Sequence, residues 1–203
     1  MDLEEILYMD MIQMRKNYMI DTLFFDTDCI SAFLWVNEEA LFEKIFKNGI
    51  VLPKPVFDEL KNPCVRKLGR KIEKMRVDGF IKIQSIDVNS EEYKIYYDLT
   101  ISPSCGKKKI GKGEAAAIAL AKTYDGIIAS NNLKDISEYV KKYQLKHITT
   151  ADILCEALEK NYIDENRGNC IWKNMINKRR MLPTYTFTEY LDLMKLQKNK
   201  KTF

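Results

Sequence analysis

The feature that most constrains the fold is an alternation of short apolar runs with longer amphipathic segments between Thr22 and Tyr162. The apolar runs are bounded by turn-forming residues, which is typical of buried strands, and the segments between them are long enough for helices. Strands that alternate with helices favour a parallel sheet covered on both faces, so the sequence predicts an α/β fold. We expect strands at 22–26, 50–52, 80–86, 126–130 and 145–148.

Three regions are expected along the 203 residues, of which 46% are hydrophobic, enough to bury one core. Residues 1–20 are expected to form a helical extension and residues 21–163 the α/β domain. Residues 164–203 are expected to form a basic extension of two helices, broken at Pro183. The sequence shows no apolar run long enough to cross a bilayer and no signal-peptide pattern, so we expect a cytoplasmic protein.

Acidic residues stand where the predicted strands end or the following helices begin. Asp26 ends the first strand, Asp28 follows it, and Asp135 comes after the fourth strand. Glu59 and Glu114 lie near the starts of predicted helices, and Glu59 is expected on the apolar side of its helix. Taken singly, such acids can cap a helix or complement its dipole in the first turn.

Taken together, these acids predict a metal site. The carboxyl ends of parallel strands meet at one edge of a sheet, so the side chains should converge there. Like charges brought together are costly unless a cation neutralises them. Oxygen ligands suit Mg²⁺ or Mn²⁺, which favours metal-assisted hydrolysis.

Other residue types leave little room for a different chemistry. His147 is the single histidine, which excludes a zinc site built on several histidines and a histidine-rich acid–base mechanism. We expect it to be a satisfied structural residue. The five cysteines are scattered without a close pair, which indicates reduced thiols.

Four segments, in order, resemble the motifs of PIN-domain proteins. They are the opening strand with Asp26 at 24–28, the acidic motif with Glu59 at 55–60, the glutamate form of the third motif at 113–121, and the fourth motif at 130–136, as written in VapC-like toxins. The resemblance covers residues 22–162. It implies a three-layer α/β/α fold, a divalent metal and endoribonuclease activity, and many such relatives are toxins neutralised by a small antitoxin.

The resemblance also implies roles for the acids. Asp26, Glu59 and Glu114 would ligate Mg²⁺ or Mn²⁺, Asp135 would complete the cluster directly or through water, and Asp28 is a further candidate ligand. The chain departs from the family at Asn131 and Asn132, where many PIN proteins carry an aspartate. The departure puts the number of metals in question, and Ser130, Asn131 and Asn132 are kept as supporting residues.

Positive charge gathers in two segments, 61–76 and 107–112, and towards the C-terminus. Clustered lysine and arginine suit a polyanionic partner, although the charge taken alone favours a solvated helix face. For RNA binding, the candidates are Lys107, Lys108, Lys109, Lys112, Arg66 and Arg70.

Two other functions stay open at this point. One is an inactive PIN fold that binds nucleic acid or acts as a scaffold, which the pair Asn131 and Asn132 favours. The other is a metal-dependent DNA nuclease that acts on flaps or single strands. An antitoxin protein and a homodimer are the protein partners to consider.

Overall fold

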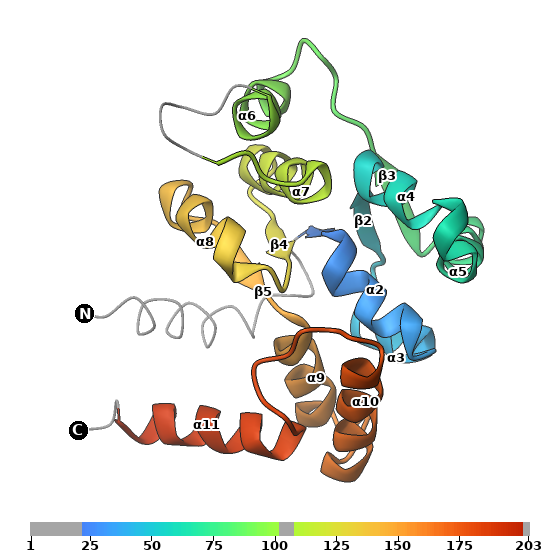
Figure 1. Cartoon of the computed structure of the whole chain (residues 1–203), viewed down its shortest axis with the longest axis vertical. Coiled ribbons are helices and arrows are strands. Elements are labelled where there is room, and N and C mark those ends of the chain that lie inside the picture. Colours follow the sequence, from blue (N-terminus) through green and yellow to red (C-terminus); the bar gives the residue numbers. More distant parts are fainter. Residues whose placement is uncertain (1–21, 102–107, 201–203) are drawn as a thin grey trace.

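The computed structural model describes residues 22–101 and 108–200, and its centre is a parallel sheet of five strands. Their order across the sheet is β3-β2-β1-β4-β5 (Figure 1). The strands span Leu23–Phe25 (β1), Ile50–Pro53 (β2), Ile81–Gln84 (β3), Ile127–Ala129 (β4) and Lys146–Ile148 (β5). All four pairings are parallel, as the alternation of apolar and amphipathic segments predicts.

Side chains alternate across the sheet and divide the interior into two cores. In β1, Leu23 and Phe25 belong to one hydrophobic cluster and Phe24 belongs to the other. This alternation follows from the two-residue period of a strand and buries both faces. The expected three-layer α/β/α arrangement is therefore confirmed.

The helices divide between the two faces. The first cluster includes residues of α2 (Thr27–Trp35), α3 (Glu39–Ile45), α4 (Lys54–Leu60), α5 (Arg66–Val77) and α9 (Thr150–Glu159). The second includes residues of α6 (Glu91–Thr100), α7 (Lys112–Thr123) and α8 (Leu133–Lys142). A short 3₁₀ turn, η1 (Pro63–Val65), joins α4 to α5.

Local sequence explains where several helices begin. The side chain of Asp26 accepts a hydrogen bond from the Asp28 backbone at the start of α2, and Ser90 does the same for Tyr93 in α6. Thr149 and Asp152 form a reciprocal capping pair at α9. Pro55 stands in the first turn of α4, where a missing N–H costs nothing.

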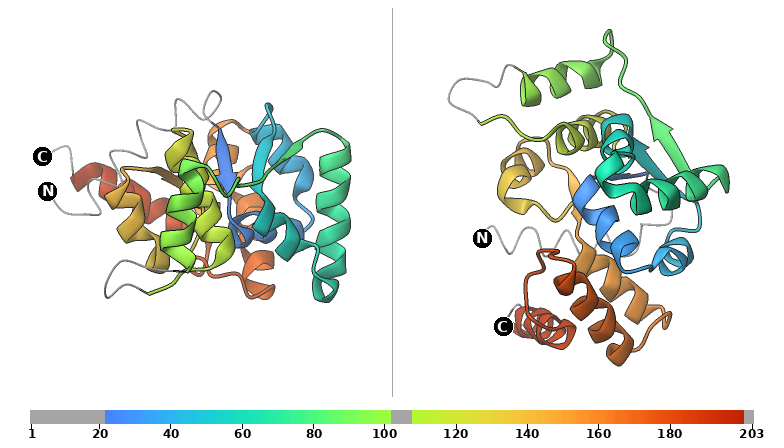
Figure 2. Two further views of the ribbon diagram at one scale, coloured as in Figure 1. Left: turned by 90° about the horizontal axis from the view of Figure 1, so that it is seen from above. Right: turned by 45° about the vertical axis from the view of Figure 1, so that its right-hand side comes forward.

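The two C-terminal helices pack onto the first core. Helix α10 (Glu165–Asn177) buries Ile171, Trp172 and Met175, and α11 (Phe187–Lys200) buries Phe187 in the same cluster. The Trp172 ring donates its N–H to the carbonyl of Thr184 at 3.0 Å, which fixes the connection between them. Figures 1 and 2 show α9, α10 and α11 together at one end of the molecule. The expected helix at 1–20 lies outside the described residues.

The order of the strands reverses between β1 and β4. From β1 the chain proceeds to β2 and β3 on one side, and then returns to place β4 and β5 on the other. Phe25 pairs with Ala129, so the residues that follow, Asp26 and Ser130, are neighbours at the carboxyl edge. Parallel α/β sheets bind ligands at such a reversal. Within the described residues, no helix is long and apolar enough to cross a membrane.

Candidate functional site: an acidic cleft at the strand ends

A cleft of about 260 Å³ opens at the reversal between β1 and β4. Its walls come from the start of α2, from α4, from the start of α7 and from the segment after α10. The lining residues are Asp26, Thr27, Asp28, Ser31, Glu59, Gly111, Gly113, Glu114 and Arg180. Four of the five predicted acids therefore meet in one cleft.

Asp26 is the deepest of these carboxylates, with 2% of its surface exposed. Its backbone N–H donates to Ala129 on the neighbouring strand at 3.0 Å. Its side chain accepts one hydrogen bond from the Asp28 backbone and one from the Ser130 hydroxyl. Burial raises the pKa of Asp26 to about 7, although these two hydrogen bonds act in the opposite direction.

Glu59 reaches the cleft from α4. Its carboxylate accepts a hydrogen bond of 2.5 Å from the Thr27 hydroxyl. We expected Glu59 on the apolar side of its helix, but the residue is exposed and faces the cleft, while Val56 and Leu60 point into the core. Gly113 packs against this pair: a Cβ there would lie 3.1 Å from a Val56 methyl carbon and 3.2 Å from the Thr27 hydroxyl oxygen, so a larger residue would require these neighbours to shift slightly.

Glu114 is held from two directions. One oxygen accepts the backbone N–H of Gly111 at 3.0 Å, as a first-turn acid does, and the other accepts the Asn132 amide at 2.5 Å. Asn132 also donates to Asp135 at 2.9 Å. Asp135 is not among the described residues that line the cleft, and the Asn132 amide links it to Glu114.

Arg180 brings positive charge into the cleft from the C-terminal region. A guanidinium nitrogen lies 3.3 Å from an Asp28 carboxylate oxygen and 3.3 Å from the Ser31 hydroxyl. Sequence reasoning missed Arg180, Thr27, Ser31 and Gly113. Arg180 belongs to a run of three basic residues ahead of Pro183. In the sequence this run is indistinguishable from the general excess of positive charge towards the C-terminus.

A family model, DUF3368, described as a PIN domain, matches residues 22–196. The chain belongs to the PIN-domain family. The match extends past the 22–162 resemblance and includes α10 and most of α11. No curated protein and no solved structure is significantly similar to this PIN domain. PIN domains are generally nucleases.

The fourth PIN motif carries Asn131 and Asn132 where many PIN proteins have an aspartate, and the two side chains have different partners. Asn132 points to the carboxylates, whereas the Asn131 side chain turns away and exchanges two hydrogen bonds of 2.8 Å with Thr150 at the start of α9. Asn132 occupies the cap position of α8, yet its side chain makes no capping bond. Ser130 and Asn132 therefore contact the carboxylates that we expected them to support. Asn131 instead contacts the start of α9.

The donors in the cleft suit a hard divalent cation, since they are carboxylate and hydroxyl oxygens. Asp26 in particular is a buried acid whose charge a cation would stabilise. Within residues 22–101 and 108–200, however, no three acidic, histidine or cysteine side chains lie close enough together to form a complete metal site. The kinds of ligand atom in the cleft therefore suit a divalent cation. The carboxylates would have to move closer together to bind it.

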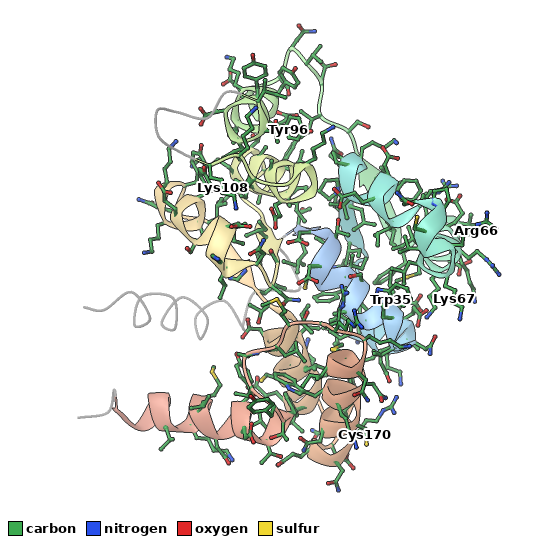
Figure 3. The ribbon with its side chains drawn as sticks, viewed as in Figure 1. Trp35, Arg66, Lys67, Tyr96, Lys108 and Cys170 are labelled. Atoms are coloured by element: carbon green, nitrogen blue, oxygen red, sulfur yellow. The ribbon has the colours of Figure 1, made fainter. Side chains whose placement is uncertain are left out.

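The basic candidates lie outside the cleft. Lys108, Lys109 and Lys112 are exposed on the approach to α7, and Lys107 lies outside the described residues. Arg66 and Arg70 are exposed on α5, and Figure 3 places Arg66 at the outer side of that helix, away from Lys108. Other cations of this segment have partners: Lys71 binds Glu39 at 2.5 Å and Arg76 binds Glu73 at 2.6 Å.

The contacts of His147 support the expectation that it is a structural residue with a satisfied hydrogen bond. It is buried, and its Nε2 lies 2.8 Å from the Ser130 carbonyl. Burial lowers the pKa of His147, which favours the neutral ring. The four cysteines in the described part of the chain are all free thiols.

Proposed function

We propose that this PIN domain is a metal-dependent endoribonuclease that hydrolyses phosphodiester bonds in RNA. The observation that carries the proposal is the cleft itself, in which Asp28, Glu59 and Glu114 surround the buried Asp26, whose pKa is about 7. A buried carboxyl group with a raised pKa, placed beside other carboxylates in a cleft, is costly to a fold, and such groups cluster at functional sites.

The residues that would hold Mg²⁺ or Mn²⁺ are Asp26 and Glu114, with Glu59 and Asp28 beside them. Such an ion neutralises the acids, lowers the pKa of water and offsets charge on the phosphate. Asp135, whose carboxylate accepts a hydrogen bond from the Asn132 amide, would act on the metal site indirectly, through that amide.

Neighbouring residues orient each carboxylate for this task. Ser130 holds one oxygen of Asp26, Thr27 holds one oxygen of Glu59, and Asn132 holds one oxygen of Glu114. Each donor leaves lone pairs on its carboxylate for another partner. The pattern resembles the outer contacts that fix ligands around metal sites.

The RNA backbone would lie along the exposed lysines next to α7 and along Arg66 and Arg70 on α5. These groups would set affinity and its salt dependence, not the chemistry. The resemblance to VapC-like toxins extends the proposal to a toxin neutralised by an antitoxin protein.

The test is a digest of single-stranded RNA and DNA of one sequence, with Mg²⁺ or Mn²⁺ and with excess chelator, alongside Asp26→Asn. We expect endonucleolytic cleavage of RNA that requires the metal and Asp26. Cleavage that persists in chelator would contradict the metal mechanism. Cleavage of DNA in preference to RNA would identify a DNA nuclease.

A second candidate is a catalytically inactive PIN fold that binds nucleic acid. The observation in its favour is that the described residues form no complete metal site, with Asn132 donating to both Glu114 and Asp135. Calorimetric titration with Mn²⁺ separates the two functions. The nuclease requires binding that Asp26→Asn weakens, and an inactive module predicts no specific binding.

A further inference from the structure

Arg180 is the one basic residue among the described residues that line the acidic cleft. It does not belong to the four motifs of the PIN resemblance, and although its Nε contacts the Lys178 carbonyl at the end of α10, its guanidinium head faces the cleft. Its guanidinium is half-buried beside two hydroxyl- or carboxylate-bearing residues of α2, Asp28 and Ser31.

The end of α10 aims Arg180 at the cleft. The backbone N–H of Arg180 donates to the Met175 carbonyl at 3.0 Å, after Arg179 adopts a positive φ of 58°. The Arg180 Nε donates to the Lys178 carbonyl at 3.2 Å. Because Trp172 and Met175 anchor α10 in the core, the fold sets the position of the Arg180 backbone at the mouth of the cleft.

The contacts of the guanidinium head inside the cleft are long. Both measure 3.3 Å, whereas charge-assisted N–H···O bonds are usually about 2.7–2.9 Å. The Asp28 side chain is also 37% exposed, so water competes for it. A guanidinium held this loosely can exchange Asp28 for a better acceptor without disturbing the core.

A phosphodiester is the acceptor that this arrangement suits. The carboxylates of the cleft would repel an anionic backbone, and a guanidinium within the cleft offsets that repulsion. Its planar fork of donors matches two phosphate oxygens, which an ammonium group cannot do. Ser31 adds a hydroxyl at the same place.

We propose that Arg180 is a substrate-binding residue that leaves Asp28 to bind a backbone phosphate of the RNA next to the bond that is cut. The proposal rests on the proposed function for the identity of the substrate. It assigns to the segment after α10 a direct part in the site.

The first experiment compares Arg180→Gln with Arg179→Gln. Both remove one positive charge at adjacent positions, and Arg179 is exposed, so general electrostatic attraction changes equally. Binding of a labelled single-stranded RNA is measured by fluorescence anisotropy in chelator, where no cleavage interferes. We expect Arg180→Gln to weaken binding about tenfold, as for a hydrogen bond to a charged group, and Arg179→Gln to have little effect. Equal effects would overturn the proposal.

The second experiment separates phosphate binding from simple neutralisation of Asp28. If Arg180 acts only by neutralising Asp28, the double variant Asp28→Asn with Arg180→Gln should bind RNA as well as the wild type. If Arg180 binds phosphate, the double variant should remain as weak as Arg180→Gln alone. Arg180→Lys should recover only part of the affinity, because it restores charge without the fork. Melting temperatures of all variants control for folding.

The outcomes distinguish this inference from the proposed function. RNA cleavage with unchanged binding and kcat/KM in Arg180→Gln would leave the nuclease intact and overturn the role of Arg180. Binding that depends on Arg180, in a protein that cleaves no RNA under any metal, would uphold the role and overturn the nuclease.

Discussion

The hydroxyl of Ser130 donates a hydrogen bond to the buried carboxylate of Asp26, across 104 positions of sequence. The bond joins the ends of β4 and β1 at the reversal of the sheet. It gives Asp26 a fixed orientation but does not offset its burial, since the pKa of Asp26 stays near 7. The metal-free protein therefore carries an acid that resists ionisation at neutral pH.

The first prediction concerns stability and pH without metal. The folded pKa of Asp26, about 7, exceeds its ordinary value of 3.8. Its contribution to the unfolding free energy is therefore fully present below pH 3.8 and is lost as the pH rises to about 7. The loss is at most about 4 kcal/mol, at roughly 1.4 kcal/mol per pKa unit. Chemical denaturation in chelator at several pH values measures it.

Asp26→Asn is the control for this titration, because it keeps a cap acceptor for the Asp28 backbone. His147 has a lowered pKa, so its contribution changes in the opposite direction, and the difference between variant and wild type cancels it. We expect Asp26→Asn to abolish cleavage and to be as stable as the wild type, or more stable, at pH 8. A marked fall in melting temperature there would contradict a destabilising charge at Asp26, because the variant retains the cap acceptor.

The second prediction concerns the number of metals. We expect one metal in the free protein, held mainly by Asp26 and Glu114, and a second only with RNA. Asn132→Asp would replace an amide that donates to Glu114 and Asp135 with a third acid. We expect a less stable metal-free protein and roughly tenfold tighter Mn²⁺ binding, equivalent to about 1.4 kcal/mol.

Asn131→Asp is the matched control, since the Asn131 side chain contacts Thr150 and not the acids. It should leave Mn²⁺ affinity unchanged in calorimetry. Two equally occupied sites in the RNA-free wild type would refute the single-metal account.

A third prediction concerns the basic segments. Replacing Lys107, Lys108 and Lys109 with alanine should weaken RNA binding and make its dependence on salt shallower, by roughly 0.7 in log–log slope per lost phosphate contact. The measurement is affinity across a salt series. Replacing the exposed Lys173 of α10 and Lys178, which directly follows that helix, is the comparison, and a larger change there would place the RNA on the C-terminal helices.

The fourth prediction concerns the attachment of α11. A Cβ on Gly168 would lie 2.4 Å from a ring carbon of the buried Phe187. Gly168→Ala should therefore displace α11 and lower the unfolding free energy by about 1–3 kcal/mol, as overpacking does. Lys173→Ala, at an exposed position of the same helix, should change it by less than about 0.5 kcal/mol. Equal stability of the two variants would contradict the packing of Phe187 on α10.

The positions of the strands, their parallel arrangement and the meeting of acids could be predicted because they follow from local patterns, whereas the order of the strands across the sheet was not predicted. Buried strands ending in Asp26 and Ser130 are evident from apolar runs, and the parallel arrangement follows from the helices between them. Details that depend on tertiary contacts could not be predicted from the sequence. Asn132 looks like a helix cap, but two carboxylates compete for its amide. Asn37 also looks like a cap, yet it adopts a positive φ of 61° and α3 begins at Glu39.

Arg180 shows why the remainder of the site could not be predicted. Nothing local distinguishes it from Arg179, its exposed neighbour. Its place in the cleft depends on the burial of Trp172 and on the turn at the end of α10. Glu59 illustrates the same limit, because the packing of α4 against α2 and α7 decides whether it faces apolar side chains or the cleft.

The sequence separations within the cleft have a consequence during synthesis. Ser130 lies 104 positions after Asp26, and Arg180 lies 152 positions after Asp28. A nascent chain that has emerged from the ribosome only as far as α7 holds all four cleft carboxylates but lacks the strand that orients Asp26 and the guanidinium beside Asp28. If the protein is the proposed nuclease, its site would be complete only after most of the chain has been synthesised. The nascent protein could not cleave nearby RNA before then.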